Sequence, residues 1–244
     1  MKQIAAFLKF GRKVYVEKLI DGEMRFSSLE TLRQREAIMQ KGIGDAAEGS
    51  LYANKVSNVM IYDERTGIGR PINVSKFRIN ISDAGRILVY CCTAVYQDEI
   101  VDGKIILPAE RIEWFKTHFS DYDSFAVILP ADTFINDMKK AFPEIKHRSI
   151  VYQDKAHDSF PHMIDPGRSP AKGVTFYSCD DFFNAFSFTK DVFFQIEGEY
   201  RFALVCDKPM DILDVQIKRS YQVEIHSMGD AFSGCICLPS KEVT

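Results

Sequence analysis

One stretch near the C-terminal end constrains the fold of this chain more than any other. Between Phe193 and Cys206 the residues alternate in character with a period of two, which is typical of a β-strand whose two faces meet different surroundings. The apolar face consists of Tyr200, Phe202, Leu204 and Cys206. The opposite face consists of Glu197, Glu199, Arg201 and Ala203. The apolar face predicts packing on a core. The charged row at the strand start is either a solvated surface with an ion pair or the floor of an active site.

The remaining segments predict one mixed α+β domain that spans residues 1–244. Gly85–Val95 is the most continuously apolar run, so we expect it to form a central buried strand. The other expected strands are Ala5–Phe10, Glu23–Ser28, Val56–Tyr62, Ile72–Ile81, Phe125–Leu129, Ser149–Tyr152, Met210–Leu213, Gln222–Ile225 and Cys235–Leu238. The expected helices are Val14–Ile20, Leu29–Met39, Pro108–Phe119, one after Pro130 and one after Asp180. This pattern predicts a mixed or antiparallel central sheet with flanking helices.

Composition excludes several classes of protein. The net charge of −3 argues against a general nucleic-acid binder, which normally carries a basic excess. The six cysteines lack zinc spacing, and the N-terminus does not have the pattern of a signal peptide. We therefore expect reduced, buried thiols in a cytoplasmic protein, with no metal. No apolar run of about 18 residues predicts a membrane helix, so no membrane partner is expected.

The pair Glu197 and Glu199, separated by Gly198, is the strongest chemical signal. Glycine lets the backbone leave a loop conformation just before the strand. Two carboxylates can divide their work, one accepting a proton and the other stabilising a developing cation. The carbon of a glycosidic bond that loses its leaving group becomes such a cation. Many surface strands nevertheless contain two glutamates at this spacing.

Residues in the first two expected strands supply further candidates with open alternatives. Ser27 and Ser28 could turn their hydroxyls into a cleft, or Ser28 could only cap the helix that follows. Lys9, between Leu8 and Phe10, needs a partner or an anionic ligand unless it reaches water from an edge strand.

Two loops complete the set of candidates. The glycine-rich loop Lys41–Ser50 lacks the Lys-Ser/Thr ending of a phosphate-binding loop. The loop His157–Gly173 is the best candidate for a mobile segment that covers a substrate. His157 and His162 in that loop have no partner spacing that favours a metal site.

The order of these features resembles a widespread, poorly characterised bacterial domain family. Its members share a basic-aromatic pair on the first strand, a Gly turn, an "FSS" strand, an acidic segment, a Cys-containing core strand, a "V-x-Y" strand and a closing "E-x-E-x-R". The matching residues are Lys9-Phe10, Leu19 to Gly22, Met24 to Ser28, Asp45 to Glu48, Leu88 to Thr93, Ile150 to Tyr152 and Glu197 to Arg201. The resemblance covers most of the chain.

The same order is similar to the Arg/His–Ser–Glu layout of ADP-ribosyltransferases. That resemblance implies an ADP-ribosyltransferase-like fold and NAD as substrate. Glu199 would hold the ribose and stabilise the oxocarbenium ion, and Glu197 would activate the acceptor. The residues expected to hold NAD are Lys9 (or Arg12), Ser27, Ser28 and Arg201. Arg201 could equally pair with Glu199 in a structural bridge.

We therefore expect a cytoplasmic enzyme of bacterial or phage origin that transfers ADP-ribose to a protein or nucleic acid, as a toxin or phage-defence effector. An alternative is a non-catalytic module that binds a nucleotide or protein in the same groove. An enzyme acting on nucleic-acid ends ranks last, because no basic cluster in the sequence exceeds Lys139-Lys140 or Lys218-Arg219.

Overall fold

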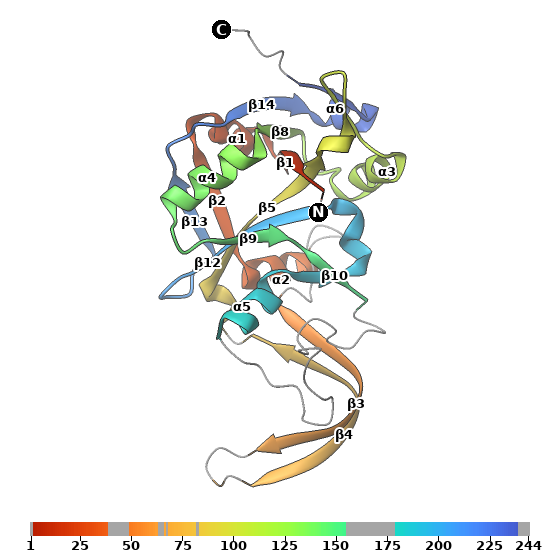
Figure 1. The fold of residues 1–244 in the computed structure, drawn as a ribbon, viewed down its shortest axis with the longest axis vertical. Coiled ribbons are helices and arrows are strands. Elements are labelled where there is room, and N and C mark those ends of the chain that lie inside the picture. The colour runs from red at the N-terminus through yellow and green to blue at the C-terminus, as the bar shows by residue number, and fades with distance from the viewer. Residues whose placement is uncertain are drawn as a thin grey trace.

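A computed structural model describes residues 2–38, 49–62, 66, 68–81, 83–154 and 179–238 (Figure 1). Within these residues the fold is mixed α+β, with an antiparallel central sheet and flanking helices, as the sequence predicts. The eight strands of the central sheet are β1 (Ile4–Gly11), β2 (Glu23–Ser28), β5 (Ile87–Tyr96), β8 (Ser124–Leu129), β9 (Lys146–Ser149), β12 (Glu199–Val205), β13 (Ile212–Gln216) and β14 (Gln222–Ser227). Their order is β13-β2-β5-β1-β8-β14, with β12 paired to both β5 and β9.

Helices flank this sheet and connect its strands. The α-helices of the described residues are α1 (Lys13–Val16), α2 (Leu29–Ile38), α3 (Ala109–His118), α4 (Ala131–Ala141), α5 (Cys179–Ser187) and α6 (Met228–Ser233). The 3₁₀ turns are η1 (Glu17–Asp21), η2 (Ala84–Arg86), η3 (Gln97–Glu99) and η5 (Val192–Glu197). Gly22 ends η1 in a left-handed conformation with φ of 79°, so the expected turn after the first helix is present.

The central sheet splits along one edge of β5. β1 pairs with β5 at Thr93–Tyr96, whereas β2 pairs with the same edge at Leu88 and Val89. Beyond these short contacts β1 continues along β8 and β2 continues along β13. The other edge of β5 pairs with β12 from Ile87 to Thr93. Two half-sheets therefore diverge from a shared pair of strands and leave a gap beside the middle of β5.

Three apolar clusters cover the sheet and leave one polar strip. One face packs Phe7, Tyr90 and Phe202 against α4. The opposite face carries a cluster around Leu8 at the β1 end and another around Val89 at the β2 end. Between these two clusters the paired positions of β5 and β12 are Cys91 with Arg201 and Thr93 with Glu199. The alternation of β12 is thus as predicted, but both of its faces are covered by protein.

Several expected elements need correction. Ser149–Tyr152 is not one strand, because the chain leaves the central sheet at Ile150 and starts β10 (Val151–Gln153), which pairs in parallel with β11 (Thr189–Asp191). The sequence reading missed α6, β11 and two short strands, since each has too few residues to show a period. The two missed strands, β6 (Ile100–Val101) and β7 (Lys104–Ile106), form a small sheet with β15 (Cys235–Cys237).

Two long strands form a separate ribbon at the foot of the molecule. β3 (Ser50–Tyr62) and β4 (Gly69–Asn80) pair only with each other among the described strands. Figure 1 shows this ribbon curving away from the central sheet. The hairpin was expected, but each strand is longer than predicted.

The cysteines follow the prediction only in part. Cys91, Cys92, Cys206, Cys235 and Cys237 are all free thiols. Cys92 is buried, whereas Cys235 and Cys237 lie exposed on the edge strand β15, which corrects the expectation that all are buried. Among the described residues, no helix has both the length and the apolar character needed to cross a bilayer.

Candidate active site

A pocket of about 150 Å³ opens at the gap where the central sheet splits. It brings together residues from β1, β2, β5, β12 and β11, which are far apart in the sequence. The residues predicted for the site that line this pocket are Lys9, Ser27, Glu197, Glu199 and Arg201. Five of the six predicted site residues therefore surround one pocket.

Ser28 is the exception, because its side chain belongs to the start of α2. It is fully buried, and its Oγ accepts a hydrogen bond from the Thr31 backbone N–H at 3.1 Å. The Ser28 hydroxyl also donates to Thr31 Oγ1 at 2.9 Å. Since strand residues alternate between faces, Ser27 turns toward the pocket and Ser28 away from it. The capping alternative therefore describes Ser28, and its expected role in holding a cofactor is corrected.

The turn between η5 and β12 places the two glutamates. Asp191 Oδ1 accepts a hydrogen bond from the Phe193 N–H at 2.9 Å and caps the start of η5. Gly198 ends η5 with φ of 58°, a left-handed conformation that favours glycine. Glu197 therefore lies in the 3₁₀ turn rather than on the strand, which corrects the expected single row. Its side chain still reaches the group that Glu199 contacts.

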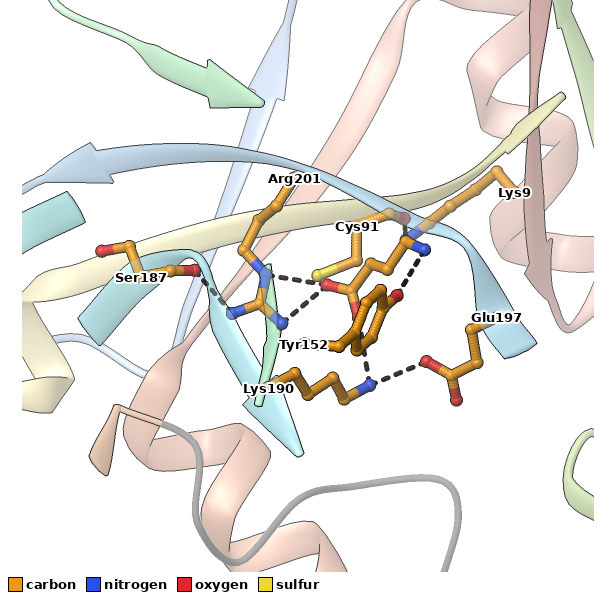
Figure 2. A network of polar contacts seen from close by, with 8 residues as sticks. Lys9, Cys91, Tyr152, Ser187, Lys190, Glu197 and Arg201 are labelled. Carbon is orange, nitrogen blue, oxygen red and sulfur yellow. Dashed lines mark hydrogen bonds and ion pairs between the residues drawn. The ribbon is translucent and has the colours of Figure 1, made fainter. Parts of the chain in front are cut away.

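A buried ion network joins both glutamates to two cations (Figure 2). Lys190 Nζ donates to Glu197 Oε2 at 2.8 Å and to Glu199 Oε2 at 3.0 Å. Arg201 donates to the other oxygen of Glu199, through Nε at 2.7 Å and Nη2 at 2.6 Å. Arg201 also donates to the Ser187 carbonyl at 2.8 Å. The side chains of all four charged residues are less than 10% exposed, so this is not the solvated surface row considered above.

The neighbouring cations determine the charge of Glu199. Burial acts to raise the pKa of this carboxyl, but Arg201 and Lys190 outweigh burial and hold the pKa well below its ordinary range. A hydrogen bond with the Cys91 thiol lowers the same pKa further. Glu199 is therefore ionised at neutral pH and accepts hydrogen bonds from fixed donors.

Residues beneath the network are uncharged. Burial raises the pKa of Cys91, and the negative charge of Glu199 raises it further, so the thiol stays protonated. Burial likewise raises the pKa of Tyr152, whose hydroxyl accepts a hydrogen bond from the Glu199 N–H at 2.8 Å. Both groups orient Glu199 without adding charge.

Lys9 fills part of the gap between the half-sheets. Its Nζ donates to the Cys91 carbonyl at 2.8 Å and lies 4.3 Å from the centre of the Tyr90 ring. The carbonyl belongs to the middle of β5, beside which neither β1 nor β2 pairs. Lys9 thus stabilises an otherwise unpaired backbone oxygen and is a partly buried cation on the pocket wall.

A second pocket of about 370 Å³ continues the gap toward α1. It shares Lys9, Ser27 and Arg25 with the first pocket and adds Arg12 and Tyr15. The Arg25 guanidinium lies 4.9 Å from the Tyr15 ring centre and forms two hydrogen bonds with Asp214. Glu23 and Asp121 also line this second pocket, so it holds cations, carboxylates and an aromatic ring together.

Sequence reasoning missed Lys190, which touches both glutamates. Nothing in the sequence around β11 indicated it, since a lone lysine in a short strand resembles any surface lysine. Tyr152 was seen only as part of the "V-x-Y" strand. The loops Lys41–Ser50 and His157–Gly173 fall largely or wholly outside the described residues. Within those residues, no three His, Cys, Asp or Glu side chains gather to hold a metal.

Comparisons with known proteins add no relationship. No protein-family model, no curated protein and no solved structure matches this chain.

Proposed function

We propose that the chain is an ADP-ribosyltransferase-like enzyme that binds NAD in the gap between the half-sheets and breaks the nicotinamide–ribose bond. The observation that carries the proposal is the convergence of Glu197, Glu199, Lys9 and Ser27 on one pocket. ADP-ribose would pass to a macromolecular acceptor, a protein or a nucleic acid. An NAD-consuming enzyme of this kind would suit a toxin or a phage-defence effector.

Cleavage of the nicotinamide–ribose bond is favoured by a negative charge near the ribose carbon, and two carboxylates line this pocket. When the glycosidic bond breaks, its electron pair leaves with nicotinamide and positive charge develops on the ribose carbon. The ionised Glu199, fixed by Arg201 and Tyr152, would stabilise that charge without reorganising. The acceptor would form the new bond to the same carbon and give its proton to Glu197.

The second pocket supports the placement of the rest of the substrate. Three cations, one aromatic ring and two carboxylates line it: Lys9, Arg12, Arg25, Tyr15, Glu23 and Asp121. Cations attract a diphosphate, and an aromatic ring offers a surface on which a base can stack. The two pockets share Lys9 and Ser27, so one dinucleotide could extend through both.

The test is release of nicotinamide from NAD, followed by chromatography, for the wild type and Glu199→Gln. We expect the variant to lose activity on the order of 10²–10³-fold, as when one preorganised electrostatic contact is removed. Unchanged release by Glu199→Gln would contradict the proposal.

A matched control separates chemistry from stability. Asp137→Asn removes another buried carboxylate, which pairs with Lys140 at 3.3 Å outside the pocket. We expect Asp137→Asn to lower the melting temperature but to retain nicotinamide release. An equal loss of release in both variants would assign the effect to folding.

One observation favours a second function. Glu197 and Glu199 already bind Lys190 and Arg201, so the described network is neutral without a ligand. A non-catalytic module that binds a nucleotide in the same groove would need no free carboxylate. Calorimetric binding of NAD without nicotinamide release, also in the presence of cell lysate, would favour this function over catalysis.

A further inference from the structure

One arginine outside the pocket holds the turn that carries Glu197. Arg111 lies on α3 and does not line the pocket, and its side chain is 12% exposed. Its Nε donates to the Ile196 carbonyl at 3.2 Å, and its Nη1 donates to Glu99 Oε1 at 2.9 Å. The guanidinium therefore ties the end of η5 to α3 and to the segment that follows β5.

The hydrogen bond to Ile196 acts on the backbone of Glu197 itself. The Ile196 carbonyl and the Glu197 nitrogen belong to one peptide group. Because that group is planar, a donor fixed on its oxygen also limits rotation of the backbone from which the Glu197 side chain leaves. The next peptide group is held inside the turn, where the Gly198 N–H donates to the Gln195 carbonyl at 3.1 Å. Arg111 thus constrains the first of the two peptide groups that flank Glu197.

Glu99 fixes the guanidinium from the opposite side. While Glu99 Oε1 pairs with Arg111, Oε2 accepts a hydrogen bond from the Tyr96 N–H at 2.8 Å. Tyr96 is the last residue of β5, so the carboxylate is anchored to the end of the central strand. The Glu99 side chain is 14% exposed, so solvent weakens this ion pair less than it weakens a surface pair. The position of η5 is therefore referred to β5 through Glu99 and Arg111.

Packing between α3 and η5 is incomplete near the Glu197 end. A pocket of about 690 Å³ lies between the two elements, and its lining includes Arg111, Trp114, Phe193 and Ile196. The Trp114 and Phe193 ring centres are 4.9 Å apart, so an apolar contact holds the first residues of η5. At the last residues of η5, the hydrogen bond from Arg111 to Ile196 bridges the two elements instead.

We propose that Arg111 is a positioning residue for Glu197, which it orients by fixing the Ile196 carbonyl. The role rests on the proposed function, in which Glu197 takes the proton of the acceptor. A base must lie within hydrogen-bond reach of the proton it removes, so a small displacement of the turn reduces catalysis. Arginine suits this role because its planar fork presents Nε and Nη1 to two acceptors at once, whereas lysine has a single nitrogen.

The test replaces Arg111 with lysine, which keeps the positive charge but cannot span Glu99 and Ile196 together. Arg111→Lys should lower kcat for nicotinamide release on the order of 10–10²-fold, the effect of slightly misplacing a catalytic group. KM for NAD should stay nearly unchanged, since Arg111 lies outside both pockets assigned to NAD. Glu99→Gln should act in the same direction, because it weakens the support of the guanidinium.

A second background separates positioning from a general effect on folding. In Glu197→Gln the base is already absent, so adding Arg111→Lys should cause no further loss of kcat. A merely structural role would lower kcat by the same factor in both backgrounds, and that outcome would overturn the proposal.

Arg86→Lys is the matched control. Arg86 Nε also donates to a backbone carbonyl, that of Cys206, at 2.9 Å, and its Nη1 lies 3.7 Å from Asp83. Arg86 lines neither of the pockets assigned to NAD. The control should therefore retain the kcat of the wild type, and a loss equal to that of Arg111→Lys would count against a specific role of Arg111.

Hydrogen exchange tests the same role without turnover. The Gly198 N–H donates within the turn, and the Ala94 N–H donates to the Gly198 carbonyl at 2.9 Å. By NMR, both amide protons should exchange roughly tenfold faster in Arg111→Lys, because the turn loses a hydrogen bond from a charged group. Arg86→Lys should leave both rates unchanged.

The two measurements separate failure of this role from failure of the proposed function. Unchanged exchange in Arg111→Lys would overturn the role of Arg111, whether or not the protein releases nicotinamide. Absence of nicotinamide release by the wild type would contradict the proposed function, and faster exchange in Arg111→Lys would still support Arg111 as the residue that fixes the turn.

Discussion

Glu199 is a buried carboxylate whose ionised form depends on Arg201 and Lys190. Because the folded state holds its pKa below the unfolded value of about 4.3, the ionised group contributes stability above that pH. This contribution is lost as the pH falls from about 5 toward the lower folded-state pKa. We expect the urea midpoint of the wild type to fall over this range more steeply than that of Glu199→Gln. Parallel slopes from pH 5 to pH 3 would contradict this account.

Lys190 keeps two neighbouring carboxylates ionised at the same time. In Lys190→Met, Glu197 and Glu199 would share a buried site with one cation fewer, so the pKa of one carboxyl should rise. A raised folded-state pKa gives stability at low pH that is lost as the pH rises through it. The variant should therefore be more stable at pH 5 than at pH 8, opposite in sign to the effect at Glu199.

The expected loss for Lys190→Met at pH 7 is about 3–5 kcal/mol, since removing one partner leaves buried charge uncompensated. Urea unfolding at pH 5 and pH 8 measures both the size and the sign. Lys190→Arg, which keeps the positive charge, is the control and should retain the pH dependence of the wild type. A Lys190→Met variant that is equally stable at both pH values would show that the two carboxylates do not interact.

At the scale of elements, the turn from η5 into β12 positions the Glu197 side chain. Gly198 has φ of +58°, and an added Cβ would lie 3.1 Å from Arg111 Nη2. Gly103 has a similar φ of +71°, but an added Cβ there would meet no atom within 4 Å. Alanine should cost roughly 1–2 kcal/mol at either position through the left-handed backbone alone.

Only Gly198→Ala should also reduce nicotinamide release, because the contact with Arg111 displaces the turn that carries Glu197. The measurement pairs urea unfolding with the chromatographic assay for Gly198→Ala and Gly103→Ala. Full activity in Gly198→Ala would mean that the turn does not need its present geometry.

The same turn shows how much of the site could be predicted from the sequence. Alternation along β12 predicted which side chains face the apolar core, because a strand forces neighbours to opposite sides. The position of Gly198 predicted a change of backbone conformation. The sequence could not show that Glu197 precedes the strand in a 3₁₀ turn, since one extra turn leaves the spacing of the glutamates unchanged.

At the scale of the whole molecule, the mixed α+β class followed from the order of apolar segments. The split of the sheet did not, because strand partners depend on contacts between distant residues. Lys190 was missed for the same reason, because its contacts with Glu197 and Glu199 exist only once β11 lies beside η5. The sequence also could not predict that both faces of β12 are buried, because the alternation of residues showed only that one face is charged.

Because β5 is shared by both half-sheets, it also determines the order in which the walls of the pocket form during synthesis. Lys9 and Ser27 are made before Glu197 and Glu199, which follow about 170 residues later and enter the sheet only when β12 pairs with β5. Pairing over such a separation is slow compared with local contacts. A nascent chain would thus hold the basic wall of the gap without its carboxylates. Whatever chemistry the pocket performs stays silent until β12 has left the ribosome and paired with β5.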